Sequence, residues 1–183
     1  MNSINQNQPE DNYKDEIGKD AVERIRKTVK KSSSCFFCTA VSTGGSSGAR
    51  PMSVRKVDGN GTLWFLSASD SHTNQEIAQN PAVRLFFQGS EYADFMHLTG
   101  IATATTDKAR IKDLWESTLK VWFTEGIDDP RITAIGFKPQ GGYYWDNKHG
   151  MVVAGAKMLV GAMLGQTLDD SIEGKLRLTR GTA

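Results

Sequence analysis

The sequence is poor in the residues that build metal centres and disulfide frameworks. It holds only two cysteines and three histidines among 183 residues, and the histidines are scattered. Cys35 and Cys38 form a CxxC, a spacing found in redox pairs and in zinc sites. Phe36 and Phe37 between them favour a buried strand, on which residues three apart point to opposite faces. Since no second Cys/His pair completes a tetrahedral set, we expect two core-lining cysteines and no metal site.

An excess of charge of one sign is also lacking. The chain carries 22 basic and 21 acidic residues, a net charge of +1. This balance gives no general electrostatic reason to bind nucleic acid or an acidic membrane. The apolar stretch 151–164 is shorter than a ~20-residue bilayer span and contains Lys157, and the polar N-terminus lacks the features of a secretory signal. We therefore expect a cytoplasmic protein without nucleic-acid or membrane partners.

The short motifs of several large enzyme classes are absent. No GxGxxG opens a helix after a strand, and there is no GxxxxGK[ST] phosphate loop or GxSxG nucleophile elbow. The glycines at positions 44, 45 and 48 lead into RPMSV, so they fit a hairpin better than a Rossmann loop. No local turn chemistry supports a Ser-His-Asp triad. These motifs leave the catalytic residues unknown.

The length favours one domain with additions at both ends, because domains commonly run to ~100–200 residues. Residues 1–13 are polar and predict a flexible tail. The main domain is expected over 14–150 and begins with an amphipathic helix over 14–31, whose apolar residues recur every four positions. Residues 151–183, first apolar and then charged, predict a C-terminal helical extension and tail.

Short apolar runs broken by glycine-rich turns are typical of antiparallel sheet. CFFCTAVST, ARPMSVRKV and TLWFLS predict three strands joined as hairpins, because Asp58-Gly59 and Asn60-Gly61 supply the backbone angles of tight turns. AVRLFFQ and FMHLTGIATATT predict two more, with a bulge or barrel corner at Gly100. RITAIGFKP and GGYYWD predict a further two. The sheet is expected to curl into a barrel.

Two helices should interrupt this sheet. The first is short: Asp70 or Ser71 can cap it, and Pro81 forbids its continuation. The second is predicted over 107–123, where apolar residues return to helical spacing.

An anion site can be assembled from these parts. Arg50 and Arg55 lie on the second strand, and at least one should face the short helix. The first turn of that helix offers unpaired backbone N–H groups and polar side chains, which suit a phosphate held opposite a guanidinium. The polar residues are Ser69, Ser71, His72, Thr73 and Asn74. Residue chemistry alone leaves the alternative open that the arginines are solvated and the hydroxyl groups only cap the helix.

The order and spacing of these pieces resemble the pyridoxamine 5'-phosphate oxidase-like split-barrel superfamily, and within it the general stress protein 26-like branch. The resemblance covers roughly residues 15–170. The matching residues are Arg50-Pro51-Met52, Asp58-Gly59, Leu63-Trp64-Phe65, Asp70-Ser71, Glu76-Ile77, Asn80-Pro81, Gly100, Ala102, Asp107, Leu114-Trp115, Gly126, Asp128-Asp129-Pro130 and Tyr144-Trp145-Asp146.

The resemblance implies an α+β fold, a six-stranded antiparallel split β-barrel with flanking helices. It also implies a homodimer that holds flavin mononucleotide (FMN) at the subunit interface. Carried over by position, the phosphate would be held by Arg50, His72, Thr73 and Asn74. Pro51 belongs to the cofactor-binding set, and Met52, Ser53, Val54 and Arg55 would run beneath the isoalloxazine ring. Leu66 and Ser67 would meet the polar edge of the ring, and Trp115 and Trp145 are candidates for ring or dimer contacts, although the core is the more common place for them.

Two departures from the family pattern bear on function. Relatives commonly carry lysine where this chain has Thr73, which removes one phosphate-binding charge. The C-terminus KLRLTRGTA differs from the substrate-binding motif resembling RLAP of the biosynthetic oxidases, which disfavours vitamin B6 oxidation. The resemblance leaves three functions open. The first is an FMN-dependent oxidoreductase of unknown substrate, with a nicotinamide donor as one option, and the second is a non-catalytic flavin-binding stress protein that acts as sensor or reservoir. The third is a split barrel that binds heme or a deazaflavin. Arg55 is the candidate cation for the pyrimidine edge of the ring.

Overall fold

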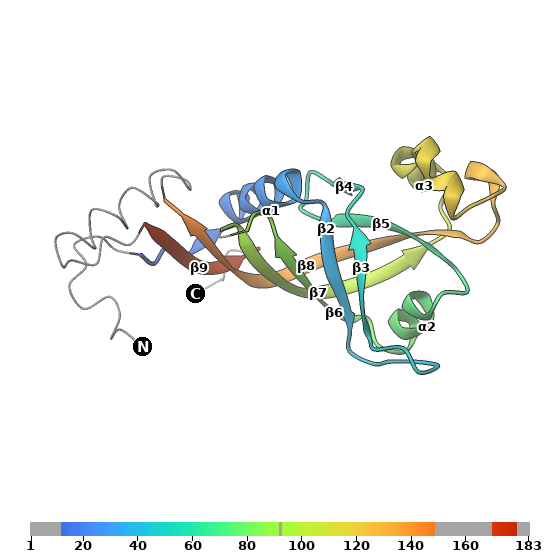
Figure 1. The fold of residues 1–183 in the computed structure, drawn as a ribbon, viewed down its shortest axis with the longest axis horizontal. Coiled ribbons are helices and arrows are strands. Elements are labelled where there is room, and N and C mark those ends of the chain that lie inside the picture. The colour runs from blue at the N-terminus through green and yellow to red at the C-terminus, as the bar shows by residue number, and fades with distance from the viewer. Residues whose placement is uncertain (1–11, 92, 149–169, 179–183) are drawn as a thin grey trace.

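One sheet carries most of the regular structure of the chain (Figure 1). The computed structural model describes residues 12–91, 93–148 and 170–178. The sheet has nine strands, and all paired neighbours are antiparallel except β1 and β9. The strands are β1 (Glu16–Ile17), β2 (Ser34–Thr39), β3 (Ala49–Ser53), β4 (Lys56–Val57), β5 (Leu63–Ala68), β6 (Ala82–Gln88), β7 (Phe95–Thr105), β8 (Ile132–Asn147) and β9 (Ser171–Arg177).

The stretch from β3 to β4 brings the two sides of the sheet together. The strand order β3-β2-β6-β7-β8 continues to β5, which pairs with the first part of β8. β3 and β5 do not pair directly, but β4 follows β3 along the chain and pairs with β5. The predicted α+β split barrel is therefore confirmed, with β2, β3, β5, β6, β7 and β8 as its six strands. Its interior is filled by fully buried side chains that include Phe37, Phe65, Leu85, Leu98 and Phe137.

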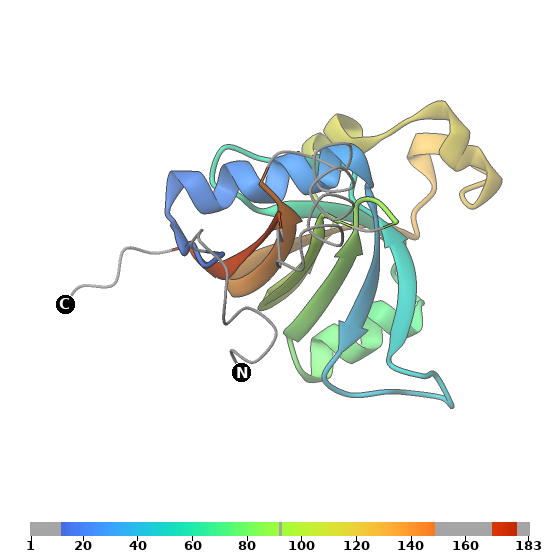
Figure 2. The ribbon, with the colours of Figure 1, turned by 60° about the vertical axis from the view of Figure 1, so that its left-hand side comes forward.

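Helices cover separate parts of this barrel. Helix α1 (Lys19–Lys31) buries Ala21 and Ile25, and it lies well apart from α2 (His72–Gln79) in both views (Figures 1 and 2). Helix α3 (Lys108–Leu114) and the 3₁₀ turns η1 (Ser117–Val121) and η2 (Gly126–Asp128) pack outside β5 and β8. There Ile111, Leu114 and Phe123 belong to a second apolar cluster.

Several predicted elements hold in detail. Ser71 caps α2, since its hydroxyl accepts a hydrogen bond from the backbone N–H of Asn74 at 3.2 Å. The predicted bulge at Gly100 is present as a register shift between Thr99 and Gly100 in the β7–β8 pair. It lies opposite Pro139, which has no N–H to give to the ladder. The bulge explains why β8 continues through Pro139 as one strand, where the sequence predicted two.

Three other expectations were wrong in their bounds. The first helix begins at Lys19 rather than Lys14, because Glu16–Ile17 pairs with β9 and Gly18 adopts a φ of +59°. The helix expected over 107–123 ends at Leu114, and the chain re-forms as η1 after the extended residues Trp115 and Glu116. Residues 171–177, expected within a helical extension and tail, form strand β9 on β8. The apolar segment 151–164 lies outside the described residues.

The second predicted strand is divided. Its first half is β3 and its second half is β4, with Val54 and Arg55 between them. The backbone N–H of Val54 donates to Ser33 at 2.8 Å, whereas that of Arg55 donates to Trp64 at 2.7 Å. The chain thus changes its hydrogen-bonding partner from β2 to β5 within two residues. This break sets the direction of the side chains around it.

Candidate functional site

A cavity of about 490 Å³ lies between the β3–β4 break, the end of β5 and the η1 turn. Its size falls in the range of small-molecule sites, ~300–1,000 Å³. Apolar and aromatic side chains dominate its wall, and the polar groups are three serines and one arginine. The lining residues are Ser34, Pro51, Met52, Ser53, Arg55, Leu66, Ser67, Ala68, Leu119, Trp122 and Phe123.

Among the described residues that line the cavity, Arg55 is the only charged one. Its side chain is largely buried, and Nη2 lies 2.5 Å from Oε2 of Glu116, which stands before η1. The approach does not have the geometry of a hydrogen bond, and among the described residues Nε and Nη2 have no hydrogen-bond partner. Buried donors are almost always satisfied, because leaving one unpaired costs about 1–3 kcal/mol. The guanidinium therefore offers unused donors at the cavity wall.

The outer wall comes from η1 and the residues after it. Leu119 and Phe123 are buried in the second apolar cluster, while Trp122 is 68% exposed and lines the cavity. Trp115, which the sequence offered as a ring contact, packs against Phe123 with ring centroids 6.2 Å apart and does not line the cavity. The sequence missed Trp122 as a cavity residue because a continuous helix over 107–123 would have placed it beside the core stripe.

The cavity connects to the start of α2 through two serines. Ser67 lines the cavity, and its hydroxyl lies 2.9 Å from the hydroxyl of the capping residue Ser71. Asn74 is buried and turns inward: its Nδ2 donates to the carbonyl of Ala68 at 2.7 Å and to Thr133 Oγ1 at 3.1 Å. Asn74 therefore ties α2 to β5 and β8, and its side-chain amide is occupied.

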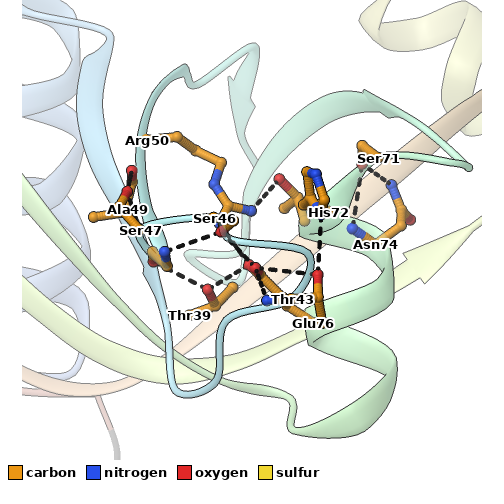
Figure 3. Close-up of polar contacts among 12 residues, drawn as sticks. Thr39, Thr43, Ser46, Ser47, Ala49, Arg50, Ser71, His72, Asn74 and Glu76 are labelled. Atoms are coloured by element: carbon orange, nitrogen blue, oxygen red, sulfur yellow. Dashed lines mark hydrogen bonds and ion pairs between the residues drawn. The ribbon is translucent and has the colours of Figure 1, made fainter.

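Arg50 reaches α2 from β3, as the sequence analysis expected for one of the two arginines (Figure 3). It lies opposite the fully buried Phe37 in the β2–β3 pair, so it points to the inner face of the sheet. Nη1 donates to Thr73 Oγ1 at 2.7 Å, and Nη2 donates to Ser46 Oγ at 3.0 Å and Glu76 Oε2 at 2.5 Å. The predicted anion-binding arginine thus already has an anionic partner within the chain.

Glu76 is the residue of this corner that site prediction missed. Its side chain is fully buried, and it accepts hydrogen bonds from Thr39 Oγ1 at 2.7 Å, Ser46 Oγ at 2.7 Å and the Thr43 N–H at 2.9 Å. Burial alone would raise the pKa of Glu76. The hydrogen bonds from Thr39, Ser46 and Arg50 outweigh that effect and lower the pKa to about 2. The glutamate is therefore ionised at neutral pH.

The loop between β2 and β3 closes over this carboxylate (Figure 3). Thr43 Oγ1 lies 3.1 Å from Nδ1 of His72, the exposed first residue of α2. Gly44 has a φ of +56°, and a Cβ there would lie 2.5 Å from Cε1 of His72. Glycine at position 44 therefore permits both the left-handed turn and the close approach of the loop to α2.

Trp145 belongs to a different surface. On the outer face of the sheet, cross-strand neighbours form a row of Pro51, Phe36, Phe86, His97 and Tyr143. The ring of Trp145 lies 6.1 Å from that of His97 and 4.8 Å from that of Tyr143. A second hollow of about 460 Å³ lies on this face, and Ser34 and Pro51 line both hollows. We refer to Phe36, Phe86, His97, Tyr143 and Trp145 as the outer aromatic face.

The two cysteines differ in burial. Both are free; Cys35 is buried, and burial together with the nearby Cys38 raises its pKa to about 12. Cys38 is only half-buried, so the expectation of two core residues holds for Cys35 alone. Over residues 12–91, 93–148 and 170–178, no three His, Cys, Asp or Glu side chains gather into a group that could hold a metal.

The model of the family described as pyridoxamine 5'-phosphate oxidase like matches residues 20–169. The chain belongs to this family. No curated protein matches it closely enough to count as a relative. In the part of the chain that the structure describes, no helix combines the length and apolar character needed to cross a membrane.

Solved structures share the fold of this family member at low sequence identity. A Jannaschia sp. CCS1 protein provisionally named general stress protein 26 is 18% identical, with a TM-score of 0.73 over 86% of this chain and 98% of its own. General stress protein 26 of Bacillus anthracis str. Sterne is 22% identical, with a TM-score of 0.58 over 67% and 92% of the two chains. A general stress FMN/FAD binding protein of Xanthomonas citri is 23% identical, with a TM-score of 0.61 over 73% and 93%. The names agree with the expected branch, and the likenesses show the fold.

The residues expected from the family pattern fall into three groups. Six line the cavity: Pro51, Met52, Ser53, Arg55, Leu66 and Ser67. Four gather where β3 meets α2: Arg50, His72, Thr73 and Asn74. Three lie apart from both: Val54 in the barrel core, Trp115 in the second cluster and Trp145 on the outer aromatic face.

Proposed function

We propose that this member of the pyridoxamine 5'-phosphate oxidase like family binds FMN and acts as an FMN-dependent oxidoreductase. The isoalloxazine ring would occupy the cavity beside the β3–β4 break, and the ribityl phosphate would extend toward Arg50 and the start of α2. The observation that carries the proposal is the buried guanidinium of Arg55 in a cavity otherwise dominated by apolar and aromatic side chains. Among the described residues its Nε and Nη2 make no hydrogen bond, and its ion pair is with the exposed Glu116.

The chemistry of the cavity fits a flat aromatic ring with one polar edge. Pro51, Met52 and Leu66 offer apolar surface from the barrel, and Trp122 and Phe123 offer it from the opposite wall. Such a ring carries carbonyl oxygens that accept hydrogen bonds. The Nε donor of Arg55 is available for them, and Nη2 becomes available when the exposed Glu116 carboxylate moves away. A nearby cation also favours the electron-rich reduced ring.

The phosphate end offers fewer free hydrogen-bond donors than its residue composition suggests. Arg50 Nη1 donates one hydrogen bond to Thr73, and Nη2 donates to Ser46 and Glu76. The N–H of Nε and the second N–H of Nη1 therefore remain for a ligand. The first N–H groups of α2, at His72 and Thr73, have no partner within the helix. These donors are the ones we assign to the phosphate.

When bound, FMN would supply hydride transfer, and a nicotinamide donor is the co-substrate that we propose. The chain would bind and orient the ring, exclude water through Trp122 and Phe123, and hold positive charge at Arg55. The substrate that receives the electrons is left open.

The outer aromatic face is the surface that we propose for a homodimer. Phe36, Phe86 and Trp145 are each more than two-fifths exposed and lie on neighbouring parts of one sheet face. Contiguous exposed aromatic surface is typical of interaction sites. Because Ser34 and Pro51 line both this face and the ring cavity, a second copy docked here would also border the flavin.

Steady-state oxidation of NADH and NADPH by the FMN-loaded protein tests the proposed activity. We expect turnover well above that of the same concentration of free FMN with at least one electron acceptor. The Arg55→Leu variant, loaded with FMN at saturating concentration, should be slower than wild type. Turnover no faster than free FMN across donors and acceptors would contradict the oxidoreductase and favour the sensor or reservoir.

A further inference from the structure

Glu76 occupies the place where an anionic ligand group is expected. Its fully buried carboxylate collects donors from three elements: Thr39 on β2, the β2–β3 loop and Arg50 on β3. Hydroxyl, backbone N–H and guanidinium donors around one anion are the set that commonly binds phosphate. In this chain, these donors surround the carboxylate of Glu76 in place of a ligand phosphate.

The charge of Arg50 is therefore compensated before any ligand arrives. Nη2 of Arg50 and Oε2 of Glu76 are 2.5 Å apart, and the two formal charges sum to zero. No other ion pair joins a charged side chain to either residue within the described parts of the chain. Thr73, which stands where relatives commonly carry lysine, contributes a hydroxyl to Arg50 and no charge.

The ring end of the cavity differs in this respect. Glu116, the partner of Arg55, is 64% exposed, so water screens its charge and it can move away. Glu76 has no such freedom, since it is buried and accepts hydrogen bonds from four residues. A ligand entering this site thus meets an available cation at the ring and a neutralised one at the phosphate.

We propose that Glu76 sets the ligand selectivity of the site: it neutralises the phosphate end, so the protein selects flavins by their ring and accepts riboflavin almost as well as FMN. The inference rests on the proposed flavin site and names the ligand class that this site takes. An uncompensated guanidinium would favour the phosphorylated ligand by about 10- to 100-fold, the usual value of a charge-assisted hydrogen bond. The neutral Arg50–Glu76 pair removes most of that preference.

The test compares the dissociation constants of FMN and riboflavin, measured by quenching of flavin fluorescence or by calorimetry. For wild type we expect the riboflavin constant to exceed the FMN constant by less than about tenfold. Glu76→Gln keeps the shape and acceptor oxygen of the side chain but removes its charge, so the ratio should rise by about tenfold or more. The gain should shrink as salt is added, because it is electrostatic. Glu76→Asp keeps the charge and should keep the wild-type ratio.

Asp146→Asn is the matched control. Asp146 is also buried, and it is ion-paired with Arg24 of α1, away from the cavity lining. Its loss should lower stability but leave the ratio of the two constants unchanged. The ratio of the two dissociation constants therefore distinguishes a change in ligand selectivity from a general loss of stability.

Two results would overturn the inference while leaving the proposed flavin site intact. One is a wild-type ratio above about tenfold; the other is a Glu76→Gln ratio equal to that of wild type. If Glu76→Gln does not fold, the wild-type ratio of the riboflavin and FMN dissociation constants decides alone: a ratio below about tenfold supports the inference, and a higher one overturns it. Binding of neither flavin by wild type would overturn the proposed function and, with it, this inference.

Discussion

Arg50 and Arg55 lie five residues apart on one stretch of chain, yet their surroundings differ sharply. Arg50 points to the inner face of β3 and is held by Thr73, Ser46 and Glu76. Arg55 lies in the strand break; among the described residues two of its nitrogens have no hydrogen-bond partner, and its ion pair is with the exposed Glu116. Arg50→Ala would leave the buried Glu76 carboxylate unpaired and destabilise the fold. Arg55 is therefore the better residue at which to test ligand binding.

Arg55→Leu should weaken flavin binding through the ring. Loss of hydrogen bonds from a charged donor costs about 1.5–3 kcal/mol, so both FMN and riboflavin should bind about 10- to 100-fold more weakly. Titration with each flavin measures the effect. Lys56→Met is the control, since Lys56 is the next residue and carries the same charge, but pairs with Asp113 outside the cavity. Equal affinity of the Arg55→Leu variant and wild type would remove Arg55 from the site.

Glu76 should also make the fold sensitive to acid. Its folded-state pKa of about 2 lies below its usual value of 4.5. The stabilising contribution is therefore complete above the unfolded pKa, and it is lost as pH falls from about 4.5 toward 2. Urea unfolding across this range should show a smaller acid-induced loss of stability in Glu76→Gln than in wild type. Parallel losses in the two proteins would show that another group dominates.

At the scale of elements, the start of α2 links the cavity to the phosphate end. Ser71→Ala removes the cap and the contact with Ser67, and should lower stability by about 0.5–2 kcal/mol. It should also weaken flavin binding, because Ser67 lines the cavity. Asp107→Ala removes the cap of α3, where Asp107 Oδ1 accepts from the Ala109 N–H at 2.9 Å. It should cost similar stability but leave flavin affinity unchanged.

Chemical denaturation and flavin titration of both cap variants check this pairing. If Asp107→Ala weakens flavin binding as much as Ser71→Ala does, the effect is general destabilisation and α2 has no special link to the site.

Local signals in the sequence predicted most elements but not the contacts that end them. The cap at Ser71 and the bulge at Gly100 depend on turn chemistry that neighbouring residues reveal. The conversion of Glu16–Ile17 into β1 depends on pairing with β9, which is about 160 residues away, and no local pattern reports it. The same holds for Glu76: a glutamate inside a short helix looks solvated until the β2–β3 loop closes on it.

At the scale of the whole molecule, the outer aromatic face should hold two copies together. Phe36→Asp places a charge on that face, so wild type should sediment as the proposed dimer and the variant as a monomer. Phe36 is 59% exposed, so the fold itself should survive. Val121→Asp is the control, because Val121 is 78% exposed but lies on η1, away from the face. A wild-type monomer, or a Phe36→Asp dimer, would contradict this interface.

The proposed activity and the proposed ligand selectivity both require that the protein binds a flavin, and the visible spectrum of the purified protein shows whether it does. Protein purified from cells or incubated with excess FMN and freed of unbound ligand should show a flavin spectrum, and mass analysis of the released chromophore should identify FMN or riboflavin. The Arg55→Leu variant should retain less flavin under the same washing. Colourless wild-type protein that fails to take up added flavin would contradict flavin binding and, with it, the proposed function.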